Sequence, residues 1–464
     1  MRALRAIVIA LGLLLVAITA YAIARRIAYP FELEWMEGEM VVHVARVLQG
    51  QPLYVAPGLS FVPFAYPPLF YYACVPLAWI SGPGFLPLRV VSIFFTLVSA
   101  GGIAAVVRPA SGRVAALAAC AAFAAAYAAS DAWFDLGRVD AMYVALLAAC
   151  YASAVRAKTR HGWALAGLFA YLAFMTKQPA LVAVAPLVAY LLLSDRPAAL
   201  WFCGTFTVLS GVTILVAQIV TGGWYWYYVF ELPRLRLGVS PRSGRLLSFW
   251  TSDLLPFVPG LVAGTIVIVR RGEWRHLALA SGLILSAWLS RLEGGAWNNT
   301  VMPAYLAAAI LLGLALRRDA SRPLLAHGVV AIQLVLLLYD PRPFIPTTQH
   351  RADGVAFLET LRTIDGSVLI LDHGFWATRS GRPEFAHGWA VTDVVWADRG
   401  EAGRRLEQEI REAISGQGFA AIVLDDERSW FFRDVENNYE SAGQIRAPAP
   451  LSGALRHPRY VYTK

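Results

Sequence analysis

Long apolar runs recur along most of this chain, and they constrain its fold more than any other feature. A helix needs about 20 mostly apolar residues to cross a bilayer. Eleven segments approach this requirement: 4–24, 87–107, 114–131, 139–155, 162–176, 179–194, 198–220, 247–269, 276–290, 296–316 and 323–339. Only 15% of the residues are charged, against about a quarter in an ordinary soluble domain. The sequence therefore predicts an all-α polytopic membrane protein with about eleven transmembrane helices within residues 1–340.

The positions of the basic residues support this count and set the topology. With the N-terminus inside, nearly every inner loop carries the basic cluster that the positive-inside rule requires: Arg2 and Arg5; Arg108 and Arg113; Arg156, Lys158 and Arg160; Arg196; Arg270, Arg271 and Arg275; Arg317, Arg318 and Arg322. We interpret the short, proline-broken segment 68–81 as interfacial or re-entrant, because counting it as a span would reverse every later loop. The net charge of +9 therefore needs no nucleic-acid partner, and no basic stripe with interleaved aromatic residues indicates one.

The first apolar run allows two interpretations. It is either a retained anchor or a cleavable signal peptide ending near residues 22–24, and its place before many further spans favours the anchor. In both cases the chain from residue 25 emerges on the outer side. The cysteines lie in apolar segments without metal-site spacing, which predicts small buried side chains: Cys74, Cys120, Cys150 and Cys203.

Beyond residue 340 the charge content becomes that of a soluble protein. Apolar residues at helical spacing alternate there with short strand-like runs. We expect helices over 355–364 and 401–415, and strands over 367–372, 419–426 and 459–463. This alternation predicts a small α/β extracytoplasmic domain, residues 341–464.

The first outer loop, residues 25–86, opens with a cluster of four carboxylates, Glu32, Glu34, Glu37 and Glu39. The apolar residues that follow recur at helical spacing and predict an amphipathic helix on the membrane surface. A helix start accounts for Glu39, because the helix dipole favours a negative charge there. Glu34 and Glu37 have less local explanation. Either they belong to a solvated loop or they serve a site.

Further ionisable residues gather at the outer ends of later spans. Asp140 stands at the start of an apolar run, where an ionisable group usually faces a cavity or a partner. Arg138 is too close in sequence to share its helix face, and it could pair with an acid of the first loop. Lys177 either snorkels to the boundary or points at a lipid phosphate. Asn299 lies at a late outer boundary.

Four arginines lie in one outer loop, against the positive-inside trend: Arg234, Arg236, Arg242 and Arg245. An anionic lipid head group would explain them. The chain contains no phosphate-binding glycine loop, HExxH, GxSxG or Cys/His metal cluster. Clustered carboxylates could hold a divalent cation through oxygen ligands, but no ligand spacing identifies one, so the sequence names no definite cofactor.

Several of these segments resemble the GT-C membrane glycosyltransferases, which include the protein O-mannosyltransferases and the lipid A aminoarabinose transferases. EGEMVVHVARVLQGQPLY and AYPPLFYY resemble the family's first outer loop, with Glu37 at the acidic position and Tyr66 in a Tyr-Pro-Pro element. GRVDAMYVALL carries an Arg-x-Asp match at Arg138 and Asp140, MTKQPAL resembles the Lys-bearing loop, and GGAWNNTVMPAYLAAAI the late Asn-containing boundary. The resemblance covers roughly residues 1–320. Many relatives have Asp at the first acidic position, where this chain has Glu37.

The resemblance implies transfer of a hexosyl or pentosyl group from a polyprenyl-phosphate donor to an acceptor hydroxyl on a glycan, lipid or protein. The reaction would take place at the outer face of the inner (plasma) membrane. A carboxylate can take the acceptor proton, and cations can stabilise the leaving phosphate. The implied catalytic residues are Glu37, its partner Asp140, and Glu34. The implied substrate-binding residues are Tyr66, Arg138, Lys177, Arg234, Arg236, Arg242, Arg245 and Asn299.

Two other classes of function stay open. A transporter or flippase of lipid-linked sugars would use similar residues, but such folds often show repeated halves with ionisable groups at the midplane. This sequence shows no repeat, and its ionisable residues gather at the outer boundary. A non-catalytic membrane scaffold that displays the C-terminal domain is the other alternative.

Overall fold

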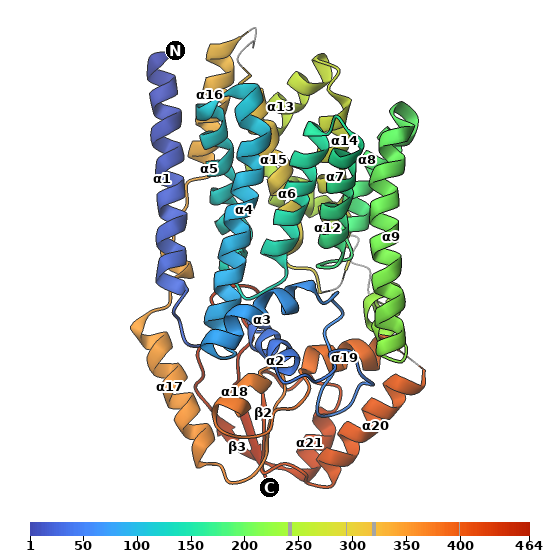
Figure 1. Ribbon diagram of the computed structural model, residues 1–464. Coiled ribbons are helices and arrows are strands. Elements are labelled where there is room, and N and C mark those ends of the chain that lie inside the picture. Colours follow the sequence, from blue (N-terminus) through green and yellow to red (C-terminus); the bar gives the residue numbers. More distant parts are fainter. Residues whose placement is uncertain (240–243, 294, 318–321, 399) are drawn as a thin grey trace.

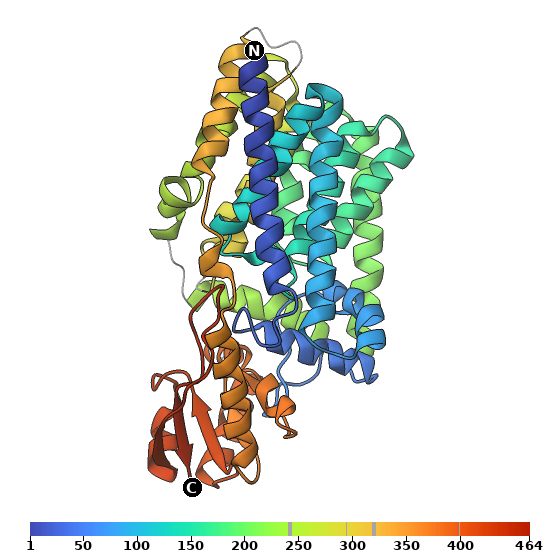
Figure 2. The ribbon, with the colours of Figure 1, turned by 90° about the vertical axis from the view of Figure 1, so that its left-hand side faces the viewer.

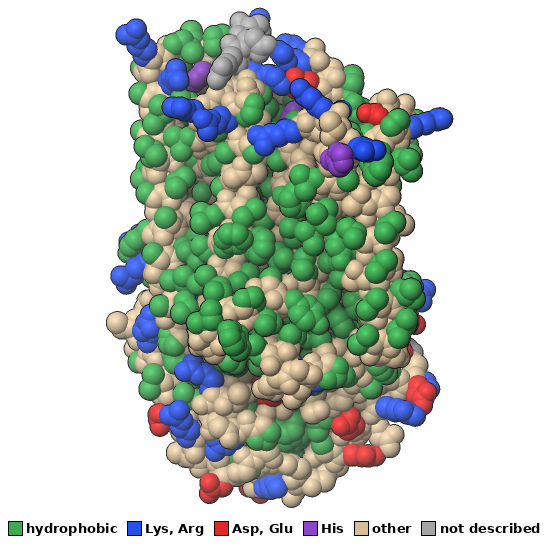
Figure 3. All heavy atoms as spheres, in the orientation of Figure 1, with side chains coloured by type: hydrophobic (Ala, Val, Ile, Leu, Met, Phe, Trp, Pro, Cys, Tyr) green, Lys and Arg blue, Asp and Glu red, His purple; other side chains and the backbone are tan. Residues whose placement is uncertain are grey.

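The computed structural model describes residues 1–239, 244–293, 295–317, 322–398 and 400–464. Most of the chain forms an elongated bundle of helices, and a small α/β part, here called the cap, covers one end of it (Figure 1). The N-terminus lies at the opposite end of the bundle, and the C-terminus lies in the cap (Figures 1 and 2). On the face shown in Figure 3, hydrophobic side chains cover the middle of the bundle, and charged side chains gather toward both ends. This distribution is that of a multi-pass membrane protein.

A helix forms at each of the eleven predicted segments. The helices are α1 (Arg2–Arg26), α4 (Phe85–Ser111), α5 (Arg113–Ala129), α6 (Asp140–Arg156), α7 (Arg160–Phe174), α8 (Ala180–Ser194), α9 (Arg196–Val220), α13 (Val258–Arg270), α14 (Trp274–Ser290), α15 (Met302–Ala315) and α16 (Pro323–Leu336). The segment predicted over 247–269 is interrupted: α12 (Gly244–Ser248) and two short irregular turns precede α13. Gly112 separates α4 from α5, and its φ of 92° allows the sharp turn.

The predicted number of spans is not confirmed by the helix lengths. Four helical segments in the described part of the chain are long and apolar enough to cross a membrane, or five if the pair bent by 43° near residue 254 is one span. Helix α8 has 15 residues, which corresponds to about 22 Å against a hydrocarbon core of about 30 Å. The count of eleven stays a prediction.

Helix α15 forms the centre of the bundle, and all its residues from Met302 to Ala315 are buried. Small residues let its neighbours approach closely. A side chain at Gly264 of α13 would meet the backbone carbonyl of Leu311, so glycine is required for this helix contact. Helix α1, by contrast, lies at the edge of the bundle in both views (Figures 1 and 2), with most of its surface exposed.

Short helices fill the space between the bundle and the cap. They are α2 (Glu37–Leu48), α3 (Leu69–Ser81), α10 (Trp224–Trp226) and α11 (Leu232–Val239). Helix α3 is the segment predicted to be interfacial or re-entrant. It has 13 residues with Pro76 inside it, and it lies near α2 at the cap end of the bundle (Figure 1).

The cap contains a four-stranded sheet with the order β1-β2-β4-β3. Strand β1 (Val368–Ile370) is parallel to β2 (Ala421–Leu424), whereas β4 (Tyr460–Thr463) is antiparallel to both β2 and β3 (Glu440–Gln444). Its helices are α17 (Thr348–Thr363), α18 (Gly374–Arg379), α19 (Gly388–Ala397), α20 (Glu401–Ser415) and α21 (Phe432–Asn438). The predicted strands and both predicted helices of this region are present. The domain boundary at 340 falls between α16 and α17 and stays a prediction.

Candidate active site

Asp140 lies at the cap end of the bundle and is held by three partners from separate parts of the chain. Lys177 Nζ donates to Asp140 Oδ1 over 2.6 Å, and Asn299 Nδ2 donates to the same oxygen over 3.1 Å. Trp133 Nε1 donates to the other oxygen over 2.8 Å. Asp140 is fully buried and Lys177 is 9% exposed. The structure thus brings together three of the predicted site residues, which come from α6, the α7–α8 loop and the turn before α15.

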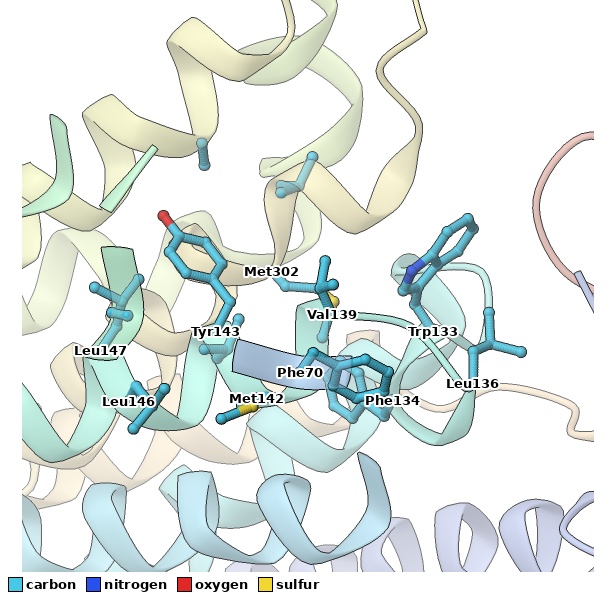
Figure 4. Close-up of a cluster of buried hydrophobic side chains, with 14 of the residues drawn as sticks. Phe70, Trp133, Phe134, Leu136, Val139, Met142, Tyr143, Leu146, Leu147 and Met302 are labelled. Carbon is cyan, nitrogen blue, oxygen red and sulfur yellow. The ribbon is translucent and has the colours of Figure 1, made fainter. Parts of the chain in front are cut away.

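An apolar cluster fixes the position of this group. Figure 4 shows Trp133 and Phe134 from the loop before α6 next to Val139, Met142 and further side chains along α6, with Phe70 of α3 and Met302 of α15 packed against them. All of these side chains are buried. Such packing holds a buried polar group rigidly, because the surrounding side chains have little room to move.

Arg138 pairs with Glu34 of the first outer loop, as the sequence suggested. Its Nη1 donates to Glu34 Oε2 over 3.1 Å, and its Nη2 donates to the Tyr66 hydroxyl over 3.3 Å. The guanidinium also lies 5.8 Å from the Trp133 ring, so Trp133 contacts both ion pairs. Arg138 Nε is buried and has no hydrogen-bond partner among the described residues. The two pairs, Glu34–Arg138 and Asp140–Lys177, form the candidate active site.

The pKa values of this group favour a proton acceptor at Glu34. Burial raises the pKa of Glu34 to about 7, although Arg138 partly opposes the rise. Burial lowers the pKa of Lys177, but Asp140 and the nearby Tyr66 together raise it above its ordinary value, so the ammonium stays charged. Glu34 therefore changes its charge near neutral pH, whereas Lys177 of the neighbouring pair stays positively charged.

Glu37 occupies a different environment from the one expected of a free base. Arg89 Nε and Nη2 donate to its two oxygens over 2.8 and 2.7 Å, and both side chains are fully buried. The backbone N–H groups of Gly137 and Leu33 donate to the same carboxylate over 2.8 and 3.0 Å. Burial opposes ionisation, but Arg89 and these N–H groups lower the pKa of Glu37 below its usual value. Glu37 ties the first outer loop to α4 and to the loop before α6. Among the contacts of the described residues, no hydrogen bond joins Glu37 to Asp140, the partner expected for it.

The outer arginines that the structure describes, Arg234, Arg236 and Arg245, do not converge on one ligand site. Arg236 binds Glu293 and Asp393 over 2.9 and 3.0 Å, which joins α11 to the cap. Arg245 donates to the backbone carbonyl of Ala296. Arg234 is exposed, and Arg242 lies outside the described residues. Glu293 and Asp393 neutralise Arg236, which explains in part why a basic loop is found at the cap end of the bundle.

The sequence did not indicate the contact between the first outer loop and the cap. His373, directly after β1, lies 2.6 Å from Glu32 and 3.2 Å from Asp425, and all three side chains are buried. Burial lowers the pKa of His373, but Asp425 and Glu32 raise it well above its ordinary value. The backbone N–H groups of Leu451 and Ser452 also donate to Leu33 over 3.0 Å. The cap thus holds the residues next to Glu34.

Signals for the missed residues exist in the sequence. Arg89 is a charged residue inside an apolar run, which usually marks a buried partner. His373 and Asp425 each follow a strand-like run, and the carboxyl ends of parallel strands share one edge of a sheet. Within the described part of the chain, no group of three or more His, Cys, Asp or Glu is arranged to hold a metal ion.

Comparisons with known proteins agree with this architecture. The family model for dolichyl-phosphate-mannose-protein mannosyltransferase matches residues 65–226, about a third of the chain, which contain Tyr66, Arg138, Asp140 and Lys177. Two crystal structures of ArnT from Cupriavidus metallidurans match over 97% of both chains. The one bound to undecaprenyl phosphate has 13% identity and a TM-score of 0.65, and the apo state has 14% and 0.66. The chain has the GT-C fold. No curated protein sequence matches it.

Proposed function

We propose that this chain is an integral membrane glycosyltransferase. It would move a hexosyl or pentosyl group from a polyprenyl-phosphate donor to an acceptor hydroxyl at the outer face of the inner membrane. The observation that carries the proposal is the arrangement of two buried carboxylate–cation pairs, Glu34–Arg138 and Asp140–Lys177, at the cap end of a GT-C fold. The binding of undecaprenyl phosphate by ArnT supports a lipid phosphate as the donor's carrier.

The chemistry needs one proton acceptor and a stabilised leaving group. The acceptor oxygen attacks the anomeric carbon, and the bond from that carbon to the phosphate oxygen breaks with its electron pair on the phosphate. The phosphate is a stable anion, so it needs positive charge and no general acid. Lys177 and Arg138 supply that charge. Glu34, with its pKa of about 7, receives the acceptor proton.

The pairs also determine how a donor can enter. Glu34, Arg138 and Asp140 are at most 2% exposed, so a donor phosphate reaches a cation only by replacing a carboxylate that now binds it. Replacement frees Glu34 or Asp140 to face the sugar or the acceptor. Lys177, the most exposed of the four, is the first contact. Tyr66 and Asn299, which now bind Arg138 and Asp140, would then contact the substrates.

The first test supplies purified full-length protein in liposomes with polyprenyl phosphates that carry different radiolabelled hexoses or pentoses, together with candidate acceptors. A glycosyltransferase releases free polyprenyl phosphate and labels the acceptor. A transporter or flippase moves the lipid-linked sugar across the bilayer without cleaving it, and a scaffold does neither. Glu34→Gln should abolish release, whereas Glu359→Gln, on the exposed surface of α17, should not change it.

A further inference from the structure

A second group of cations lies at the cap end of α1. A cavity of about 610 Å³ opens there between the last turns of α1 and the segment that leads into α17. Its lining includes Tyr21, Arg25, Arg342, Thr347 and Arg351. The volume lies in the range of about 300–1,000 Å³ that small-molecule sites occupy. None of the lining residues belongs to the candidate active site. We call this space the α1 cavity.

The α1 cavity carries an excess of positive charge. Arg25 is exposed, and its side chain has no ion-pair or hydrogen-bond partner in the part of the chain that the structure describes. The Arg351 guanidinium lies 5.5 Å from the Tyr29 ring, and none of the ion pairs found among the described residues includes it. Arg342 binds Asp340 over 2.7 Å. The residues found to line the cavity include three arginines and no Asp or Glu. With Arg342 neutralised by Asp340 outside this lining, about two positive charges are left for an anion.

The position of the cavity identifies the kind of anion. Tyr21 is 52% exposed one turn before Arg25, and an aromatic residue followed by a cation is typical of the membrane–water interface. Leu13, Leu14 and Val16 are exposed along the same helix, which offers an apolar surface for acyl chains. Lys and Arg side chains lie at the edge of the molecule near this end of α1, at the border of the apolar band (Figure 3). A single Lys or Arg is enough to anchor a helix end at the membrane surface, whereas three arginines line the α1 cavity.

We propose that the α1 cavity binds the phosphodiester head group of an anionic phospholipid from the outer leaflet. The guanidinium groups of Arg25 and Arg351 contact the phosphate oxygens, a pairing whose planar geometry suits Arg. The acyl chains lie along the exposed surface of α1. The neighbouring Arg26 points the other way, into the protein, where it binds Asp135 over 2.9 Å and the carbonyl of Phe344 over 2.7 Å. Because Arg25 and Arg26 are adjacent on α1, a lipid bound at Arg25 would stabilise the contacts of Arg26, which join α1 to the loop before α6 and to the segment that leads into the cap.

Native mass spectrometry of the full-length protein tests the proposal. The purified protein is titrated with phosphatidylglycerol or phosphatidylcholine of matched chains. We expect one phosphatidylglycerol to bind preferentially, and the double variant Arg25→Gln/Arg351→Gln to weaken that binding about thirtyfold, because each arginine near a membrane surface contributes about a fivefold factor. Arg25→Lys/Arg351→Lys should retain most of the affinity.

The control variant Arg428→Gln/Arg433→Gln removes the same charge from exposed positions of the cap and should bind like the parent. Equal binding of the two lipids would overturn the proposal, as would unchanged phosphatidylglycerol binding by Arg25→Gln/Arg351→Gln. Displacement of the lipid by millimolar inorganic phosphate would show a site for free phosphate instead, and would overturn the lipid assignment.

Discussion

Replacing Glu37 by Gln should destabilise the protein strongly, because Glu37 neutralises a buried arginine. The carboxylate accepts two bonds from Arg89 and one each from the backbone N–H groups of Gly137 and Leu33. A glutamine at this position removes the charge and turns an NH₂ group toward donors. Removing one partner of a buried ion pair costs about 3–5 kcal/mol. We expect Glu37→Gln to lower the free energy of unfolding by that amount.

Denaturant titration of the detergent-solubilised protein measures this cost through a double-mutant cycle. Glu37→Gln and Arg89→Gln should each be strongly destabilising, and the double variant should cost about 2–3 kcal/mol less than their sum, because no charge is left unpaired. The exposed pair Glu359–Arg362 is the control, and its loss should cost at most about 0.5 kcal/mol. If Glu37→Gln melts like Glu359→Gln, Glu37 is not a structural ion-pair partner and its role as a base regains support.

The pH dependence of stability follows from the same pair. The folded pKa of Glu37 lies below its usual value of 4.5. A depressed carboxyl pKa contributes stability above the unfolded value, and this contribution is lost as the pH falls through the folded value. The parent should therefore lose stability below about pH 4.5, and Glu37→Gln should lose less over that range.

Three further predictions concern the candidate site and the cap. Because Glu34 must be unprotonated to act as a base, kcat/KM should rise with pH around a midpoint near 7, and initial rates of Glu34→Gln should lack this rise. Lys177→Met should lower kcat by about 10²–10³-fold at saturating donor, whereas Lys177→Arg should retain part of it; equal rates would refute a role in stabilising the leaving group. His373→Gln should leave Glu32 and Asp425 facing each other without a cation, and limited proteolysis should then release the cap faster than in the parent.

The positions of the helices were predictable from the sequence, whereas their lengths and interruptions were not. Apolar runs located every helix of the bundle because a spanning helix is marked by composition alone. The irregular turns before α13 depend on packing around Leu254 and Phe257, which are both buried. The amino-acid composition does not change at these turns, so the sequence does not indicate them. In the cap, β3 has five exposed residues without alternation, so no strand pattern marks it.

The candidate site was predictable as a set of residues but not as a set of pairs. A pair between Arg138 and an acid of the first outer loop could be expected, because Arg138 cannot share the helix face of Asp140. The structure identifies that acid as Glu34. Lys177 and Asn299 bind Asp140 although they lie 37 and 159 residues away in the sequence. The packing of α8 and α15 in the bundle brings these side chains together. Arg89 binds both oxygens of Glu37 and so makes this carboxylate a structural partner of α4. One charged residue within an apolar run therefore changed which carboxylate the site offers as a base.

The most direct measurement of the central claim is the rate at which Asp140→Asn releases free polyprenyl phosphate from a donor that the parent cleaves. Asn has the same shape as Asp, and its one carbonyl oxygen can still accept from Lys177 and Asn299 while its NH₂ group faces Trp133 Nε1. Unfolding curves therefore accompany the rate measurement, which is made on folded Asp140→Asn protein. The account predicts a loss of at least about a hundredfold in rate, with Glu359→Gln unchanged. Release by a folded Asp140→Asn variant at the parental rate would contradict the assignment of these buried pairs as the site of sugar transfer.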